Sequence, residues 1–181
     1  MAARTPDYTP LLAEGLQDQI IAILQRDFLA NLNTINAAAA YPGIADYHKA
    51  EQDAYPNAPE AIVEPIETAI AQDDKAFITA QHVFAVSVYV SGGGDNEQLA
   101  QMSRDYARAL VWTLGRRMDM SDYWTSLPIV YAGVSRNSTG MPAGTVKEVS
   151  IRHVGWALKG KQSTEFGRLP IVEIAIVTCE D

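Results

Sequence analysis

The chain has 181 residues, of which 48% are hydrophobic and 20% are charged. This length and composition predict one folded domain over residues 1–181, with enough apolar side chains to build a core. Its formal net charge of −8 repels phosphate, which argues against sequence-specific binding of nucleic acid. Cys179 is the only cysteine, so an intrachain disulfide is excluded and no oxidising compartment is indicated.

The beginning of the chain predicts a loose arm over residues 1–9. Its sequence lacks the charged region followed by an apolar region that marks a signal peptide. The longest apolar runs of the chain are also far shorter than a membrane span. We therefore expect a protein that is made in the cytoplasm and has no membrane partner.

A long helix is predicted over residues 11–36. Thr9 and Pro10 are the residue types preferred at the N-cap and the first helical position. Apolar residues then recur at helical spacing and predict one buried stripe. The members of this stripe are Leu12, Leu16, Ile20, Ile23, Leu24, Phe28, Leu32 and Ile35.

A long loop is predicted at about residues 41–60, because this stretch is rich in proline and interleaved with tyrosines. We expect a short helical turn at 44–52 within it. Loops of this length are uncommon in compact domains and often make contacts. Tyr47 and Tyr55 are therefore candidate interface residues, and a plain surface excursion is the alternative.

Residues 61–70 predict an irregular edge strand, because Pro65 cannot donate a hydrogen bond to a sheet ladder. A short helix after Pro65 is the alternative. The run 77–90 then alternates between an apolar face, with residues such as Phe84 and Val86, and a mixed face. This period of two predicts a strong strand that packs helices on one side.

A second helix is predicted over residues 96–114, after a glycine turn at 92–94. Asp95 and Gln98 have the spacing of a variant capping box, and Gly115 suits the position after the last turn. The expected buried stripe consists of Leu99, Met102, Tyr106, Leu110, Thr113 and Leu114. We expect the opposite face to carry Arg104, Asp105 and Arg108.

Three further strands are predicted at 129–134, 146–158 and 171–177, with loops at 135–144 and 159–168. The order is helix, loop, weak strand, strong strand, helix and three strands. This order predicts an α+β fold, a mostly antiparallel β-sheet with helices packed on one face.

The sequence contains no recognisable catalytic or cofactor site. The glycine turn lacks the Lys-Ser/Thr pair of a phosphate loop, and Asp95 would repel phosphate. His82 and His153 alternate with apolar residues in strands, so each is expected to be a hydrogen-bonded histidine near the core rather than a metal ligand. We therefore expect no enzyme activity, no cofactor and no metal.

The three tryptophans have two interpretations. Trp112, Trp124 and Trp156 could form a binding patch, but tryptophans in a domain of this size usually belong to the core or to a subunit interface. The sequence alone leaves both open.

The unit formed by His82–Val90, the turn Gly92–Asp95 and the helix from Glu97 to Leu114 resembles tail terminator and tail-completion proteins of long-tailed bacteriophages. The leading helix, the edge segment near Pro65 and the later strands continue this resemblance over most of residues 10–178. It rests on the order of the elements and on the hydrophobic pattern, without a diagnostic motif.

The resemblance implies a structural virion protein that forms a ring, typically of six copies, at the head-proximal end of the tail tube. Such a ring ends tube polymerisation and joins the tail to the head connector. The implied partners are the chain itself, the major tail tube protein and the connector or neck proteins. Genomic DNA would only pass through an acidic lumen, and the ring would be assembled in the host bacterial cytoplasm.

The two late loops carry cations in an otherwise acidic protein, so they are candidate contacts to neighbouring rings. The candidate residues are Arg136, Asn137, Met141, Lys159, Lys161 and Arg168. Ordinary solvated hairpin tips are the alternative for each. At the level of the whole protein, the alternatives are another neck or head-closure component, a small α+β enzyme, or a binding module with an unrecognised site.

Overall fold

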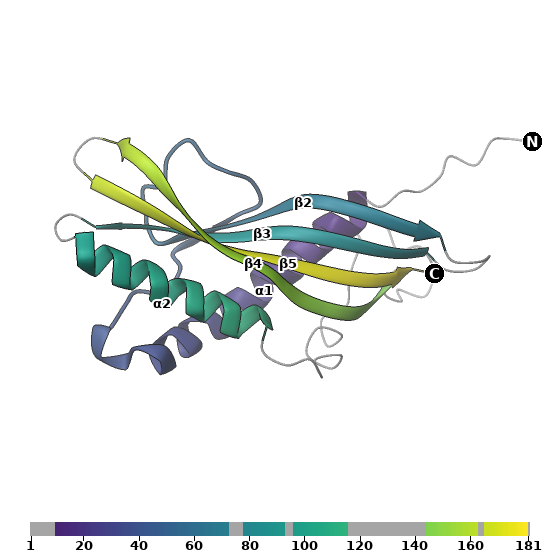
Figure 1. Cartoon of the computed structure of the whole chain (residues 1–181), viewed down its shortest axis with the longest axis horizontal. Helices are drawn as coiled ribbons and strands as arrows, with labels where there is room; N and C mark the ends of the chain where they lie inside the picture. The colour runs from purple at the N-terminus through teal and green to yellow at the C-terminus, as the bar shows by residue number, and fades with distance from the viewer. Residues whose placement is uncertain (1–9, 73–77, 93–95, 116–143, 163–164, 181) are drawn as a thin grey trace, which may run out of the picture.

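The computed structural model describes residues 10–72, 78–92, 96–115, 144–162 and 165–180. Within these ranges Figure 1 shows long strands running side by side as a twisted sheet, with two α-helices against it. In chain order the elements are α1 (Pro10–Ile35), the 3₁₀ turn η1 (Ala37–Ala39), β1 (Asp46–His48), β2 (Glu60–Gln72), β3 (Ile78–Gly92), α2 (Asn96–Gly115), β4 (Gly144–Gln162) and β5 (Glu165–Glu180).

The strands form one sheet in the order β1-β2-β3-β5-β4. The three-residue strand β1 runs parallel to β2, and all other neighbours are antiparallel. Both helices share a single hydrophobic core with the sheet. The predicted α+β fold, with helices packed on a mostly antiparallel sheet, is confirmed.

The core lies between the helices and one face of β3. Phe84, Val86, Val88 and Val90 alternate along β3, and none of them is exposed to solvent. They pack against the buried stripes of α1 and α2, which follow the helical spacing expected from the sequence. Each fully buried side chain of this size stabilises the fold by roughly 1.5–3 kcal/mol relative to an exposed one.

Two polar contacts hold α2 in place. The buried Asn31 of α1 donates from Nδ2 to Thr113 Oγ1 of α2 over 2.9 Å. The hydroxyl of Tyr106 in α2 donates to the carbonyl of Pro42, in the segment between η1 and β1. Burial raises the pKa of Tyr106, so this phenol stays protonated and remains a donor.

A second, smaller packing region lies on the face of the sheet away from the helices. There the ring of Tyr55 stacks on that of Tyr89, with centroids 4.7 Å apart. A Cβ added to Gly167 of β5 would come within 2.3 Å of the Tyr89 ring, so this ring lies directly over the glycine. The chain between β1 and β2 therefore covers part of the second sheet face.

Four predictions are wrong. Residues 44–52 contain β1 instead of a helical turn, because this segment pairs with Glu60–Ile62. Residues 159–168 are mostly strand, since β4 continues to Gln162 and β5 begins at Glu165. Asp105 is buried instead of facing out, and His153 is exposed instead of lying near the core.

Several predictions fall on residues that the structure does not describe. They concern the arm at 1–9, the cap at Asp95, the strand at 129–134 and the loop that follows it up to residue 143. The edge position predicted for Pro65 is confirmed, since β1 reaches only as far as Ile62 on that side of β2.

Candidate functional site

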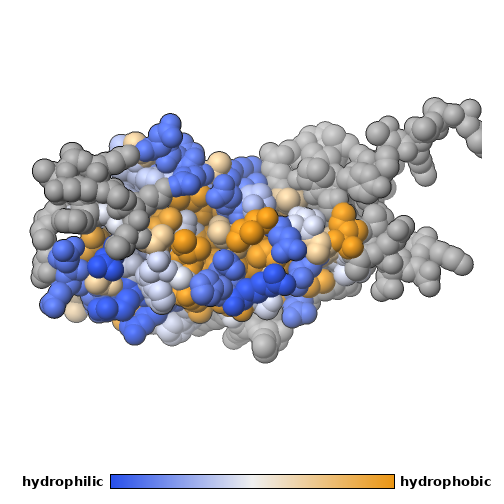
Figure 2. Space-filling view, turned by 45° about the horizontal axis from the view of Figure 1, so that its top comes forward, coloured by the Kyte–Doolittle hydropathy of each residue, from blue (hydrophilic) through white to orange (hydrophobic). Residues whose placement is uncertain are grey.

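The large apolar side chains that remain exposed indicate where the chain makes contacts. The face in Figure 2 shows orange hydrophobic residues between blue hydrophilic ones. In the described part of the chain, the exposed large hydrophobic residues are Leu29, Ile66, Ile70, Trp112 and Trp156. Trp112 belongs to α2 and Trp156 to β4. Both isoleucines belong to β2, towards the opposite edge of the sheet from β4.

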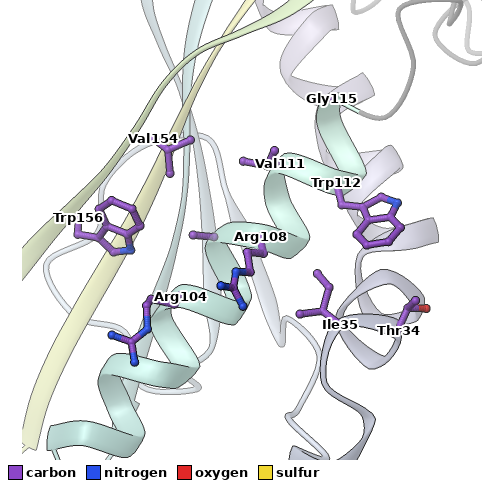
Figure 3. Close-up of a pocket in the computed structure, with 10 residues that line it drawn as sticks. Thr34, Ile35, Arg104, Arg108, Val111, Trp112, Gly115, Val154 and Trp156 are labelled. Carbon is purple, nitrogen blue, oxygen red and sulfur yellow. The ribbon is translucent and has the colours of Figure 1, made fainter.

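The tryptophans lie in a groove of about 920 Å³, which we call the α2–β4 groove. Figure 3 shows α2 as its floor, with side chains of β4 on one side and the end of α1 on the other. Its lining residues are Thr34, Ile35, Arg104, Ala107, Arg108, Val111, Trp112, Gly115, Val154 and Trp156. Trp156 is 57% exposed and Trp112 is 41% exposed. Exposing apolar side chains of this size to water costs free energy unless a partner covers them.

The groove is cationic as well as aromatic. Arg104 and Arg108 lie one helical turn apart on α2 and are both exposed. The guanidinium of Arg104 donates to the neutral Gln101 side chain over 2.8 Å, so its charge is not neutralised by that contact. Arg108 lies 3.5 Å from a carboxylate oxygen of the buried Asp105. The groove therefore suits a partner that is both apolar and anionic.

Asp105 of α2 holds two of the elements that line the groove in place. Its carboxylate accepts a 2.9 Å hydrogen bond from Asn36 Nδ2, directly after α1, and a 3.0 Å bond from Gln101. Burial, and to a smaller extent the nearby Asp105 carboxylate, raises the pKa of Tyr41. The buried carboxylate thus ties the end of α1 to the middle of α2.

The second surface is the exposed part of β2 from Glu64 to Ile70, which we call the β2 edge. Each of these seven residues is exposed. The ladder to β3 pairs Pro65 with Phe84 and Glu67 with Val83, so Ile66 is an additional residue without a partner, a β-bulge. A hollow of about 450 Å³ lies beside the bulge, lined by β2, by Ala13 and Gln17 of α1 and by Lys49.

The bulge places two carboxylates on one face of β2. Glu64 pairs with Ala85 and Glu67 pairs with Val83, and these partners are two residues apart on β3. Residues two apart on a strand share a face, and cross-strand partners do too, so Glu64 and Glu67 lie about 7 Å apart on the same face. Lys49 lines the same hollow as Glu67, and its ammonium lies 2.8 Å from Asp18.

The loop predicted as a contact region is held by a hydrogen-bonded cluster. His48 Nε2 lies 2.6 Å from Glu60 Oε2, and the backbone N–H of Asn57 donates to the other oxygen of Glu60 over 2.7 Å. Tyr55, which stacks on Tyr89, has a pKa raised chiefly by burial. Tyr47 in β1 is half-buried against the main core. Their interface role stays a prediction.

The other candidate interface residues do not form one cluster that the structure describes. Lys159 and Lys161 belong to β4, and Arg168 in β5 pairs with Val90. Arg136, Asn137 and Met141 lie outside the described residues. The sequence analysis did not predict that Arg104, Arg108 and the two tryptophans line one groove, although the exposed charged face of α2 was the available signal.

A catalytic arrangement of histidines is not supported by the described ranges. His82 is fully buried, and its ring nitrogens lie 3.1 Å from Thr68 Oγ1 and 3.3 Å from Thr178 Oγ1. Burial lowers its pKa to about 4, so it stays neutral. His82 is thus the hydrogen-bonded core histidine that the sequence predicted.

The described residues contain no group of three His, Cys, Asp or Glu side chains that could hold a metal ion. None of the helices in the described ranges is long and apolar enough to cross a membrane.

Comparisons with known proteins include a likeness to a solved structure. No family model matches the sequence, and no curated protein matches it. A chain of a solved structure described as the "Virion of native gene transfer agent (GTA) particle" is similar with a TM-score of 0.49 and 16% sequence identity. The match covers 94% of this chain and 99% of that chain.

Proposed function

We propose that the protein is a non-enzymatic structural subunit of a phage-like virion, which forms a ring at the head-proximal end of a tail tube. In this role the ring ends tube polymerisation and joins the tail to the head connector. The proposal rests on the positions of two exposed surfaces, the α2–β4 groove and the β2 edge. They lie towards opposite edges of one sheet.

Two different surfaces on opposite sides of a subunit favour head-to-tail association. Such a contact is heterologous, and it produces a closed ring when the rotation between neighbours closes. A ring of six copies is the number that the resemblance implies. The described element order, with a leading helix, an edge strand, a strong strand, a helix and a strand pair, also agrees with that resemblance.

The net charge supports the same role. A formal charge of −8 gives a ring whose lumen repels DNA, so the genome passes through without being bound. The proposed partners are therefore other copies of the chain, the tail tube protein and a connector or neck protein. The proposed location is the tail or neck of the virion.

The experiment is a tube-length assay. Purified tail tube protein is polymerised with and without this chain, and the tubes are measured by electron microscopy. We expect tubes of limited length with a ring of this protein at one end. Tubes whose lengths and ends are unchanged at saturating protein would contradict the proposal, and a ring on a connector instead would assign the protein to another part of the neck.

A binding module for a small molecule is the second candidate, favoured by the volume and chemistry of the α2–β4 groove. A groove of about 920 Å³ with two arginines and two tryptophans fits a drug-sized anionic ligand. A thermal-shift screen with aromatic and aliphatic carboxylates tests this candidate. Stabilisation that disappears in Trp156→Ala would favour it over the ring.

A further inference from the structure

We propose that the β2 edge of one copy occupies the α2–β4 groove of the next copy, with Ile66 against the tryptophans and Glu64 and Glu67 against the arginines. The inference rests on the proposed ring function and names the contact that would build the ring. The candidate residues of the late loops play no part in it, since neither surface belongs to those loops.

The first argument is complementary charge. The groove presents Arg104 and Arg108, and the β2 edge presents Glu64 and Glu67 in an acidic protein. Residues four apart on a helix have Cβ atoms about 6 Å apart. The Cα atoms of Glu64 and Glu67 lie about 7 Å apart and share one face, because the bulge brings the two residues into register. The two pairs of charges therefore match in sign and in spacing.

The second argument is complementary apolar surface. Ile66 is 53% exposed and lies between Glu64 and Glu67 in the sequence, and Trp112 and Trp156 are exposed on either side of the two arginines. An aliphatic side chain next to acids fits a groove in which aromatic side chains lie next to bases. Large aromatic residues and arginine are also the types that dominate the binding energy of protein interfaces.

The third argument concerns the kind of contact. Pro65 has no N–H to offer, and the bulge at Ile66 interrupts the ladder, so the β2 edge is a poor template for adding another strand. The contact is therefore made by side chains in a groove rather than by backbone pairing. Because the groove lies at the other side of the sheet, two copies cannot satisfy both surfaces by a two-fold contact, and the association continues from copy to copy.

Charge reversal tests the proposal with a built-in rescue. One variant carries Arg104→Glu and Arg108→Glu, a second carries Glu64→Arg and Glu67→Arg, and a third carries all four changes. Mass photometry and sedimentation measure self-association of the full chain. We expect each double variant to associate at least about tenfold more weakly, and the fourfold variant to recover to within about threefold of the original chain.

Mixing the two double variants sharpens the result. An acidic groove then meets a basic edge, and a basic groove meets an acidic edge, so the mixture associates with alternating copies although neither variant associates alone. The single variant Arg104→Glu leaves the contact between Arg108 and the buried Asp105 intact, so it keeps the test valid if the double groove variant does not fold. Arg26→Glu is its matched control, since Arg26 is an exposed helical arginine outside both surfaces. This control should have little effect on self-association.

The inference is overturned if folded double variants associate like the original chain, if the fourfold variant does not recover, or if the original chain stays monomeric at all concentrations. The tube-length assay is independent of these results. Tubes that are still capped by the charge-reversed variants would refute this contact and leave the proposed function standing. A confirmed charge rescue together with uncapped tubes would refute the proposed function and leave the contact standing.

Discussion

Both halves of β2 pair with β3, but one half is buried and the other is exposed to solvent. From Glu60 to Val63 the strand is buried, and β1 pairs with its first three residues. From Glu64 to Ile70 every residue is exposed. Gln17 of α1 marks the boundary, because its buried amide donates to the carbonyl of Val63 over 2.8 Å and also to that of Lys49. One half of the strand therefore serves stability, and the other half is available for contacts.

The largest expected effect comes from the buried half. Ile62 is 3% exposed, so Ile62→Ala leaves a cavity and should lower the free energy of unfolding by about 2–5 kcal/mol. Urea denaturation measures this change. Ile70→Ala is the matched control in the same strand, because Ile70 is 48% exposed and its loss should cost less than about 0.5 kcal/mol. Equal losses for both variants would contradict the division of β2.

Acid should lower the folding stability of the domain through His82, which lies where the exposed half of β2 meets the core. His82 lies opposite Thr68 of β2, and its pKa of about 4 is below the ordinary value of 6.5. The unfolded chain therefore binds the proton more readily, so stability is unaffected above pH 6.5 and falls as the pH drops towards 4. A shift of this size corresponds to about 3 kcal/mol at most.

This pH dependence is measured by denaturation of the original chain and of His82→Gln between pH 7 and pH 4. The variant should lose stability less steeply across that range, whatever its stability at pH 7. His153→Gln removes an exposed histidine and serves as the control, with a pH profile like that of the original chain. Parallel profiles for all three proteins would mean that His82 does not titrate in this way.

A smaller loss of stability is expected from a substitution under the Tyr55–Tyr89 stack, which covers the sheet beside the buried half of β2. Gly167→Ala places a methyl group against the Tyr89 ring and should cost about 1–3 kcal/mol through overpacking. Gly92→Ala is the control in the adjacent strand, since its added Cβ would meet Leu99 at an ordinary 3.7 Å. Thermal unfolding of both variants compares them, and a Gly167→Ala protein as stable as Gly92→Ala would show that the ring moves freely.

The smallest effect on stability should come from the exposed half itself. Ile66→Ala should change the free energy of unfolding by less than about 0.5 kcal/mol, because Ile66 is largely exposed and unpaired in the bulge. The same variant should weaken self-association, whereas Ile70→Ala should weaken it less. Denaturation and mass photometry on the same samples separate the two properties. Loss of stability without loss of association would reverse the interpretation of this half.

The elements with long hydrophobic periodicity were the ones that sequence could predict. The expected helix at 11–36 is α1, and the helix at 96–114 is α2 within one residue of its end. The three-residue β1 could not be found in this way, because it forms only by pairing with Glu60–Ile62 across a loop. Asp105 was misplaced for a similar reason, since its partner Asn36 is 69 residues away along the chain.

The candidate site was less accessible from sequence than the fold. The tryptophans could be named as a patch or as core, but their position beside Arg104 and Arg108 depends on how β4 crosses α2. The spacing of Glu64 and Glu67 depends on a bulge at Ile66, which periodicity does not indicate. Both facts follow from tertiary register rather than from local propensity.

The order of the strands has a consequence for synthesis on the ribosome. β5 lies between β3 and β4, and its residues from Phe166 to Glu180 pair with β3 residues made some 90 positions earlier on average. Until β5 emerges, the central strand β3 has an open side, and β4 has no place in the sheet. The domain should therefore complete its folding only after β5 has been made, so that copies reach one another as finished subunits rather than as nascent chains.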